Sequence, residues 1–307
     1  MTVLIVGSVA LDSVETPHGR VDRALGGSAP FASLASKLFA PTALLGVVGA
    51  DFPAEHIGNL RRWGIDIQGL EIVPDGKTFH WAGRYHENMN DRDTLTTELN
   101  VLATHHPDVP EPLSRPDFLF LANTSPELQM KTLSQVERPR LVLADSMNLW
   151  IDTAREALWE MIRSVDVFLL NDSEAHSLCE TRSLLVAARR LLDEGVGRVI
   201  IKKGEHGSLM VTRDSVFCAP AYPLERVCDP TGAGDSFAGA YLGHLAQAKT
   251  LDEEAHRCAL IAGAAVAAFN CETFSIERLS GLTRADVDAR CREIHAMTRF
   301  EALDSLP

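Results

Sequence analysis

A carboxylate follows three small residues in the stretch VCDPTGAGDSFAGAYLG, which ends at Gly243. Gly232, Ala233 and Gly234 precede Asp235, and an apolar pattern with the period of a helix begins at this point. The first turn of a helix offers free N–H groups and the positive end of the helix dipole, so bare backbone there can bind an anion such as a phosphate. The same dipole keeps an aspartate ionised, and the carboxylate could then accept a proton from a hydroxyl group. The stretch alone fits equally well with a simpler structure, in which Asp235 only caps a helix after a flexible turn.

Two common phosphate-binding motifs do not fit this stretch. A Walker loop requires GxxxxGK[ST], and this string does not occur in the sequence. The dinucleotide fingerprint GxGxxG requires a third glycine where Phe237 stands, and the preceding PLERVCDP is a poor core strand. The pattern therefore indicates a more general anion site beside a carboxylate, and it argues against a dinucleotide-dependent oxidoreductase.

The composition is that of an ordinary globular enzyme or binding protein. The chain has 307 residues, 46% of them hydrophobic, and a formal net charge of -13 from 42 acidic and 29 basic residues. No cluster of five or more Lys and Arg occurs in the sequence, so we expect neither nucleic acid nor an anionic membrane as a partner. The six cysteines lack zinc-ligand spacing, which favours reduced thiols in a cytoplasmic protein. We also expect no signal peptide, because the N-terminus lacks a basic segment, and no membrane span, because the apolar runs are too short.

Short apolar runs alternate with longer amphipathic segments along the chain. The runs predict strands at residues 2–6, 43–48, 118–122, 141–145, 167–171 and 198–203, followed by a hairpin that turns near residues 213–215. The segments between them predict helices at 28–38, 53–63, 126–136, 152–163, 173–179 and 183–194, and residues 235–299 are largely helical. Strands that are apolar throughout are typical of parallel sheets covered on both faces. The pattern therefore predicts an α/β fold, with a doubly wound, mostly parallel sheet flanked by helices in a single domain over residues 1–307.

Two segments, at 11–27 and about 71–103, interrupt this alternation and predict a small β-sheet lid at the edge of the main sheet. Phe79, Trp81 and Tyr85 alternate with polar residues, so we expect their side chains on one face of a lid strand. That face would either stack on a sugar or base, or pack against the main domain or a second subunit, which leaves a homodimer through the lid open. The polar tip of the lid, expected near the substrate when the lid shuts, carries Asn88, Asn90 and Arg92.

The stretch DPTGAGDSFAGAYLG closely resembles the C-terminal signature of the ribokinase-like, or pfkB, carbohydrate kinases. Members of this family phosphorylate sugars, nucleosides or polyols with ATP. The resemblance implies that Asp235 is the catalytic base and that the amides of residues 232 to 234 form an anion hole. It also places Asp229 and Thr231 where some members bind a monovalent cation such as K⁺.

Further segments lie in the order expected for the same family. Asp12 in GSVALD and the paired glycines of LGGSAPFAS match its substrate side. The substrate-binding residues that the resemblance implies are Asp12, Gly26, Gly27, Ser28 and Asn123.

The nucleotide side rests on two segments, NDSE and KKGEHG. NDSE matches the family's NxxE, which implies that Asn171 and Glu174 place Mg²⁺ through water. Without the rest of the pattern, the same two residues would be interpreted as a helix capping box. The residues implied to bind ATP are Asn171, Glu174, Lys202, Lys203, Gly204, Gly207, Thr231 and Gly263.

Three departures from the family pattern leave the substrate open. No asparagine follows the paired glycines, DSMNLW replaces DPNxRxxLW, and FNCETFSIERL stands where a Gly-rich segment is commoner. The resulting prediction is an ATP- and Mg²⁺-dependent phosphotransferase that phosphorylates a hydroxyl group of a small sugar or sugar-like substrate. A nucleoside or inositol kinase of the same fold is the alternative, and a non-catalytic nucleotide-binding sensor is the alternative from a different class.

Overall fold

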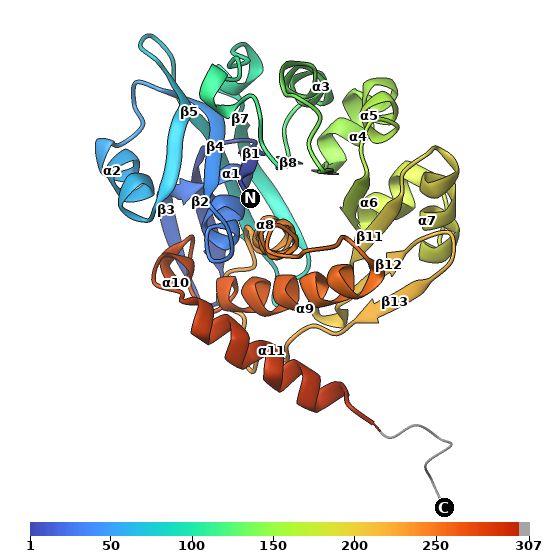
Figure 1. The fold of residues 1–307 in the computed structure, drawn as a ribbon. Coiled ribbons are helices and arrows are strands. Elements are labelled where there is room, and N and C mark those ends of the chain that lie inside the picture. The colour runs from blue at the N-terminus through green and yellow to red at the C-terminus, as the bar shows by residue number, and fades with distance from the viewer. Residues whose placement is uncertain (301–307) are drawn as a thin grey trace, which may run out of the picture.

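The computed structural model of the chain describes residues 1–300. Within this range, one nine-stranded sheet has the order β13-β12-β11-β10-β9-β8-β1-β4-β5 (Figure 1). All neighbouring pairs from β11 to β5 are parallel, and β12 and β13 extend the sheet as an antiparallel hairpin. The strands are β1 (Val3–Val6), β4 (Thr42–Gly49), β5 (Ile65–Val73), β8 (Phe118–Leu121), β9 (Leu141–Asp145), β10 (Val167–Asn171), β11 (Arg198–Lys202), β12 (Ser208–Val211) and β13 (Val216–Ala219).

Helices cover both faces of this sheet, because successive side chains of each strand point to opposite sides. Val3 and Ile5 of β1 belong to one buried apolar cluster, whereas Leu4 and Val6 belong to a second. The first cluster is completed by α1 (Ser28–Ser36), α2 (Ala54–Arg62), α8 (Ala233–Leu245), α9 (Glu253–Asn270), α10 (Glu277–Ser280) and α11 (Arg284–Thr298). The second is completed by α3 (Pro126–Gln135), α4 (Asn148–Thr153), α5 (Arg155–Ile162), α6 (Asp172–Cys179) and α7 (Leu184–Asp193). The predicted doubly wound α/β fold is confirmed.

One expected helix is divided in two. The sequence predicts a single helix over 152–163, but α4 already begins at Asn148, and α5 starts only at Arg155. Ala154 separates them with φ -139° and ψ 37°, a backbone conformation that is not helical. The prediction of a single helix is therefore wrong at this point. The sequence does not indicate the break, because neither Gly nor Pro marks it.

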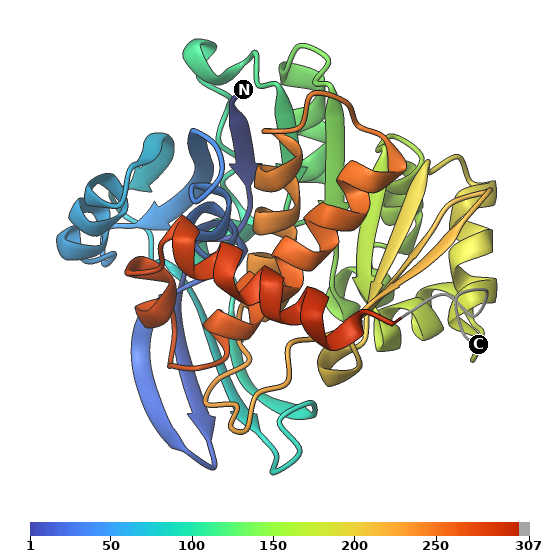
Figure 2. The same cartoon turned by 60° about the horizontal axis from the view of Figure 1, so that its bottom comes forward.

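A second, smaller sheet lies beside the first, with its four strands in the order β3-β2-β6-β7. Its strands β2 (Ala10–Thr16), β3 (Gly19–Gly26), β6 (Phe79–Tyr85) and β7 (Arg92–Glu98) come from the two segments that interrupt the alternation. β2 and β6 pair in parallel, and the two outer pairs are antiparallel hairpins. Figure 2 shows these hairpins projecting from the helical body. We call them the small sheet below.

The parallel order brings polar residues together at one edge of the main sheet. The carboxyl ends of neighbouring parallel strands meet at the same edge, which is where α/β proteins bind ligands. Asp145, Asn171 and Lys202 are the last residues of β9, β10 and β11, and Asn123 follows β8 by two positions. In residues 1–300, no helix combines the length and the apolar character that a membrane crossing requires.

Candidate active site

The TGAGD stretch forms the start of α8, at this edge of the sheet. Gly232 is the N-cap, with φ 76° in the left-handed region, and a Cβ there would lie 2.4 Å from the ring of Phe31. Only glycine fits both the backbone conformation and the space. Asp235 is the third residue of α8, and its side chain accepts a hydrogen bond from its own backbone amide, one of the free N–H groups of the first turn. Asp235 is therefore not the N-cap residue, because that position is held by the bare backbone of Gly232.

Three carboxyl groups from different elements gather around Lys202. Burial raises the pKa of Asp145, Glu174 and Asp235, and the charge of Lys202 lowers it. The charge on Asp235 raises the pKa of Asp145 and of Glu174 further. Burial outweighs the lysine, so the net pKa of each carboxyl group is raised. The Nζ atom of Lys202 lies only 2.7 Å from the place where a Cβ on Gly234 would stand, so this cation directly adjoins the first turn of α8.

One oxygen of this cluster has no partner. Asp145 is 3% exposed, and its Oδ1 makes no hydrogen bond, although the buried environment penalises an unpaired carboxylate oxygen. The hydroxyl groups of Thr124 and Ser146, on the loops after β8 and β9, are also buried without partners. Within the described chain, three buried polar atoms at this edge of the sheet therefore lack hydrogen-bond partners, which a bound ligand would supply.

Asn171 and Glu174 form a capping box at the start of α6. The Glu174 amide donates to Oδ1 of Asn171 at 2.8 Å, and the Asn171 amide donates to Oε2 of Glu174 at 2.7 Å. This satisfies two free N–H groups of the helix start. The box uses one oxygen of each side chain, so the Nδ2 of Asn171 and the Oε1 of Glu174 stay available to a ligand.

The KKGEHG segment is the turn between β11 and β12, with a short 3₁₀ helix over Gly204–His206. Gly207 has φ 77°, and a Cβ on it would lie 2.1 Å from the carbonyl oxygen of Ala219, so the turn requires a glycine here. Lys203 closes the turn by donating its amide to the Gly207 carbonyl at 2.7 Å. The turn follows Lys202 directly and so adjoins the charge cluster.

Gly263 is not part of this cluster. It is buried inside α9, where a Cβ would lie 2.9 Å from the carbonyl oxygen of Phe237 in α8. Its observed position is thus a close helix–helix contact behind the TGAGD stretch.

Asp12 lies against the paired glycines that precede α1. Its Oδ2 accepts a hydrogen bond from the Gly27 amide at 3.3 Å, and a Cβ on Gly26 would lie 1.9 Å from the same oxygen. The side chain is 7% exposed, and burial, together with the charges of Asp229 and Asp235, raises the pKa of Asp12 to about 7. Asp12 is therefore close enough to Asp235 to share one site with it.

The polar atoms of Ser28 and Asn123 are already paired. The Ser28 hydroxyl donates to the Asn123 carbonyl at 3.1 Å and accepts from the Ser8 amide at 3.1 Å. The Asn123 side chain accepts from Trp150 Nε1 at 3.0 Å and donates to Met147 Sδ at 3.1 Å. Sequence patterns do not reveal Trp150 and Met147 as partners of Asn123, because these contacts join the loop after β8 to residues that follow β9.

Asp229 shapes the turn before α8. Its two oxygens accept hydrogen bonds from the amides of Thr231 at 2.9 Å and Ser275 at 3.1 Å, and the side chain is 1% exposed. Asn270 donates to the Thr231 carbonyl at 2.7 Å. The FNCETFSIERL segment, unusual by sequence, thus holds this turn through Asn270 and Ser275. Among residues 1–300, no group of three or more His, Cys, Asp or Glu has an arrangement that could hold a metal ion.

The small sheet reaches this site through Tyr85 and the 86–91 loop. The Thr231 hydroxyl donates to the Tyr85 hydroxyl at 3.2 Å. Asn90 lies against Gly204, where its Oδ1 would be 2.9 Å from a Cβ, and donates to Glu205 at 3.5 Å. The two contacts span from the start of α8 to the turn after β11, so the small sheet covers the edge between them.

The three aromatic residues of β6 do not form one wall. Phe79 packs against a separate apolar cluster with Val47 and Val101, and Tyr85 is buried. Trp81 lies over Gly83, whose Cβ would be 2.2 Å from the indole ring, and is partly exposed. Trp81 is therefore the one of these three that is neither buried nor packed in that cluster.

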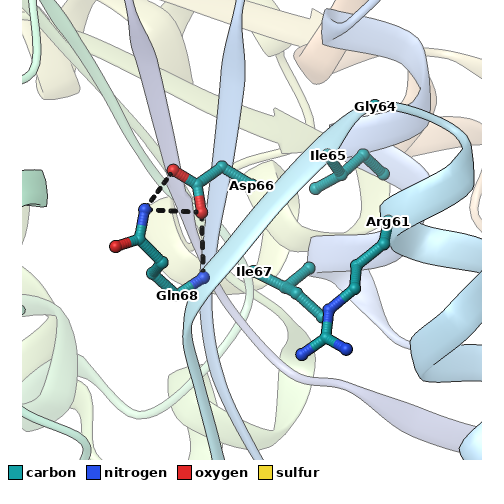
Figure 3. Close-up of a pocket in the computed structure, with 6 residues that line it drawn as sticks. All are labelled: Arg61, Gly64, Ile65, Asp66, Ile67 and Gln68. Atoms are coloured by element: carbon teal, nitrogen blue, oxygen red, sulfur yellow. Dashed lines mark hydrogen bonds between the residues drawn. The ribbon is translucent and has the colours of Figure 1, made fainter.

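A shallow pocket at the end of α2 lies elsewhere (Figure 3). Its lining includes Asp66 and Gln68 at the start of β5, and these two side chains hydrogen-bond to each other. Because β5 is parallel to β4, its start lies at the edge opposite to the charge cluster. The pocket therefore does not belong to the candidate active site.

The chain is similar to several known kinases. A cytidine kinase of Thermococcus kodakarensis is 30% identical over 260 residues, which cover 82% of this chain and 91% of the relative. A nucleoside kinase of Methanocaldococcus jannaschii is 28% identical over 84% of this chain and 82% of the relative. The solved structure of a Burkholderia thailandensis nucleoside kinase in complex with inosine has the same fold, with a TM-score of 0.77 at 22% identity over 96% of this chain and 99% of that chain.

The family assignment rests on most of the chain. The profile of the pfkB family carbohydrate kinases matches residues 3–278, from β1 to α10, and so includes both the main sheet and the small sheet. Together with the likeness to the cytidine kinase, this match shows that the chain belongs to the pfkB family of carbohydrate kinases.

Proposed function

We propose that the protein is an ATP-dependent nucleoside kinase, with Asp235 as the general base. The observation that carries the proposal is the position of Asp235 in the first turn of α8, close enough to both Asp12 and Lys202 for their charges to interact with it. An acceptor hydroxyl group held near Asp12 and a phosphate held near Lys202 would meet at this carboxylate.

The transfer itself is a displacement at the γ-phosphorus of ATP. The acceptor hydroxyl gives its proton to Asp235 as its oxygen bonds to phosphorus, and the bond to the bridging oxygen of ADP breaks. The amides of Gly232 and Gly234 would donate to the oxygens of the transferring group, whereas the Ala233 amide already donates to the Pro230 carbonyl at 3.1 Å. A raised pKa suits a base that must take up a proton near neutral pH.

Residues of the nucleotide side fit a triphosphate. Lys202 and Lys203 supply positive charge in an otherwise acidic protein, and the bare turn from Gly204 to Gly207 lets a ligand approach the backbone. Asn171 and Glu174 each keep a free polar atom beside Lys202, so these residues would hold Mg²⁺ through water. When bound, Mg²⁺ neutralises charge on the β- and γ-phosphates.

The acceptor is a nucleoside in this proposal, rather than a free sugar. Two relatives that match most of the chain are named cytidine kinase and nucleoside kinase. Trp81 is partly exposed and pairs with Asp12 between β2 and β6, so a base would lie near its ring when Asp12 binds the ribose hydroxyl groups. A deoxyribokinase of Salmonella typhi, 27% identical over 76% of this chain, keeps a sugar as the second candidate.

The small sheet acts as a lid in this proposal, within one kinase domain. Closing it over the two substrates would exclude water and limit wasteful hydrolysis of ATP. β3 and β7 are its free edges, and Leu95 on β7 is 52% exposed. A homodimer through the lid therefore remains a proposal, as does K⁺ binding beside Asp229 and Thr231.

A substrate panel tests the proposed function. ADP release is measured with MgATP and each of the common nucleosides, ribose, deoxyribose, fructose and inositol, with phosphorylated products identified by ³¹P NMR. Turnover with one or more nucleosides at least about tenfold above that with free sugars is expected, given a specific base contact worth more than about 1.4 kcal/mol. Turnover with sugars alone would replace the nucleoside by a sugar. ATP binding without turnover on any acceptor would favour the sensor alternative instead.

A further inference from the structure

Arg92 differs from two other arginines of the small sheet, which form ion pairs. Arg84 forms an ion pair with Glu15, at 3.1 Å and 3.2 Å, and Arg23 forms one with Asp51 at 2.9 Å. Arg92, the first residue of β7, has no carboxylate oxygen within 4.0 Å in residues 1–300. Its guanidinium instead lies 5.8 Å from the ring centroid of Trp81. A cation placed over an indole ring is held in position, while its N–H groups remain free for a ligand.

The backbone fixes where this guanidinium can go. Arg92 pairs with Tyr85 across the β6–β7 hairpin, and neighbouring strands lie about 4.8 Å apart. Tyr85 is tied in turn to Thr231, just before the first turn of α8. Arg92 therefore starts its side chain one strand away from the anchor that joins the small sheet to the TGAGD stretch.

The loop that precedes Arg92 reaches the nucleotide side. Asn90 contacts Gly204 and donates to Glu205, in the turn after β11. Arg92 thus lies beside Tyr85, which contacts the turn before α8, and two residues after Asn90, which contacts the nucleotide-side turn. A phosphoryl group that passes from ATP to the acceptor would move close to both contacts.

The charge of Arg92 is felt inside the site. It lowers the pKa of Asp235 and of Glu174, against the larger effect of burial, although Arg92 belongs to a different sheet. Lys202 and Arg92 are the two cations that act on both carboxyl groups. The DSMNLW segment supplies no arginine, so no guanidinium comes from that loop.

We propose that Arg92 is a catalytic residue, whose guanidinium donates to the oxygens of the γ-phosphoryl group when the small sheet closes over the site. This inference rests on the proposed kinase function and adds to it a link between closure and transfer. A planar guanidinium can donate to two phosphoryl oxygens at once, which a lysine cannot do. Because Arg92 comes from the small sheet, the positive charge at the transferring group would be complete only in the closed state.

Two variants separate this role from a structural one. Arg92→Ala removes the guanidinium, and Arg92→Lys keeps the charge without its fork. Arg84→Ala is the matched control, because Arg84 lies in the adjacent strand of the same sheet and its ion pair with Glu15 is exposed. Thermal unfolding checks that all three variants fold.

The first readout is binding, which needs no acceptor. Isothermal titration calorimetry gives the Kd for Mg-ADP and for a non-hydrolysable ATP analogue. Arg92→Ala should raise the Kd for the ATP analogue by about tenfold, because one charge-assisted contact is lost. The Kd for Mg-ADP should change by less than about twofold. Arg84→Ala should change neither value. An unchanged ratio of the two Kd values in Arg92→Ala would overturn the inference.

The second readout is turnover with the best acceptor of the substrate panel. In Arg92→Ala, kcat should fall by about 10² to 10³-fold, whereas the acceptor KM should change by less than about fivefold. Arg92→Lys should recover little of the lost kcat. If Arg92→Ala keeps the kcat of the unaltered enzyme, Arg92 does not act on the transferring group. If the unaltered enzyme phosphorylates no acceptor, the proposed function fails, and the binding ratio still decides whether Arg92 meets a γ-phosphate.

Discussion

The Thr231 hydroxyl group donates a hydrogen bond to the Tyr85 hydroxyl group at 3.2 Å, and this contact joins positions 146 residues apart. Tyr85 belongs to β6 of the small sheet, whereas Thr231 lies in the turn that leads into α8. Tyr85 is 7% exposed, so the hydrogen bond is shielded from water. This contact, together with the hydrogen bond from the Thr16 hydroxyl to the Cys228 carbonyl at 3.0 Å, connects the small sheet to the segment that carries the proposed base.

Removing this contact should loosen the closed state. Tyr85→Phe keeps the buried ring but removes the hydroxyl group, a loss of about 1 kcal/mol. We expect the acceptor KM to rise by about fivefold and ATP hydrolysis without acceptor to increase, because water enters a site that closes less well. Steady-state assays with and without acceptor measure both effects.

Tyr222→Phe is the control for Tyr85→Phe. The Tyr222 hydroxyl donates to Glu293 at 2.7 Å, in a contact between the segment after β13 and helix α11. It should leave KM and basal hydrolysis unchanged. Equal effects of the two substitutions would show that the Tyr85 hydroxyl does not serve closure.

Gly232→Ala should damage both the fold and the site. The left-handed φ of 76° costs an alanine about 1 kcal/mol, and the contact of its Cβ with the Phe31 ring at 2.4 Å adds about 1 to 3 kcal/mol of overpacking. Gly64→Ala provides the matched control, because Gly64 has φ 83° but no atom within 4 Å of a Cβ. Chemical denaturation should show a larger loss of unfolding free energy for Gly232→Ala than for Gly64→Ala, and only Gly232→Ala should lose turnover.

Much of the fold follows from local patterns. The runs at 141–145 and 167–171 match β9 and β10 in full, because strands buried on both faces show unbroken apolar sequence. The capping box of Asn171 and Glu174 is equally local, since its two hydrogen bonds join residues three positions apart. Ala154, in contrast, ends α4 with no Gly or Pro in the sequence to mark the break.

The site was less accessible to sequence reasoning, because its partners come from distant segments. The contacts of Asn123 with Trp150 and of Asn270 with Thr231 depend on how the sheet orders its strands and where α9 ends. The sequence identifies Arg92 only as one polar residue at the tip of the lid, since nothing in the sequence shows that it lacks an ion-pair partner. Resemblance to a family named the principal positions, and the structure shows which of their polar atoms are already paired.

Asp12 should make stability depend on pH. Its folded pKa is about 7, compared with 3.8 for the free side chain, so the folded chain holds an extra proton between these values. Its contribution to stability is therefore present in full below about pH 4 and is lost as the pH rises through 7. Asp12→Asn removes this dependence, and its Tm should fall less than that of the unaltered protein between pH 5 and 8. The remaining buried carboxyl groups with raised pKa, Asp145, Glu174, Asp229 and Asp235, keep part of the slope in both proteins.

An exposed carboxylate gives the opposite sign and serves as the control. Hydrogen bonds from Lys131 and Gln135 lower the pKa of Asp108, so its contribution is present at neutral pH and is lost on acidification. Asp108→Asn should therefore lower Tm slightly at neutral pH and leave the fall between pH 5 and 8 intact. If Asp12→Asn keeps the slope of the unaltered protein, Asp12 is not the protonated group.

Asp235→Asn tests the proposed base most directly. The substitution keeps the size of the side chain and removes a charge that burial disfavours, so the variant should fold and be at least as stable at neutral pH. Binding of the ATP analogue should persist, because the amides at the start of α8 and Lys202 are unchanged. The value of kcat should fall by about 10² to 10⁴-fold, the usual contribution of a positioned general base. The pH dependence provides a second readout: kcat/KM of the unaltered enzyme should decline on acidification as Asp235 becomes protonated, and the residual rate of Asp235→Asn should lack this decline. Turnover near that of the unaltered enzyme, with the same pH profile, would assign the proton transfer to another group.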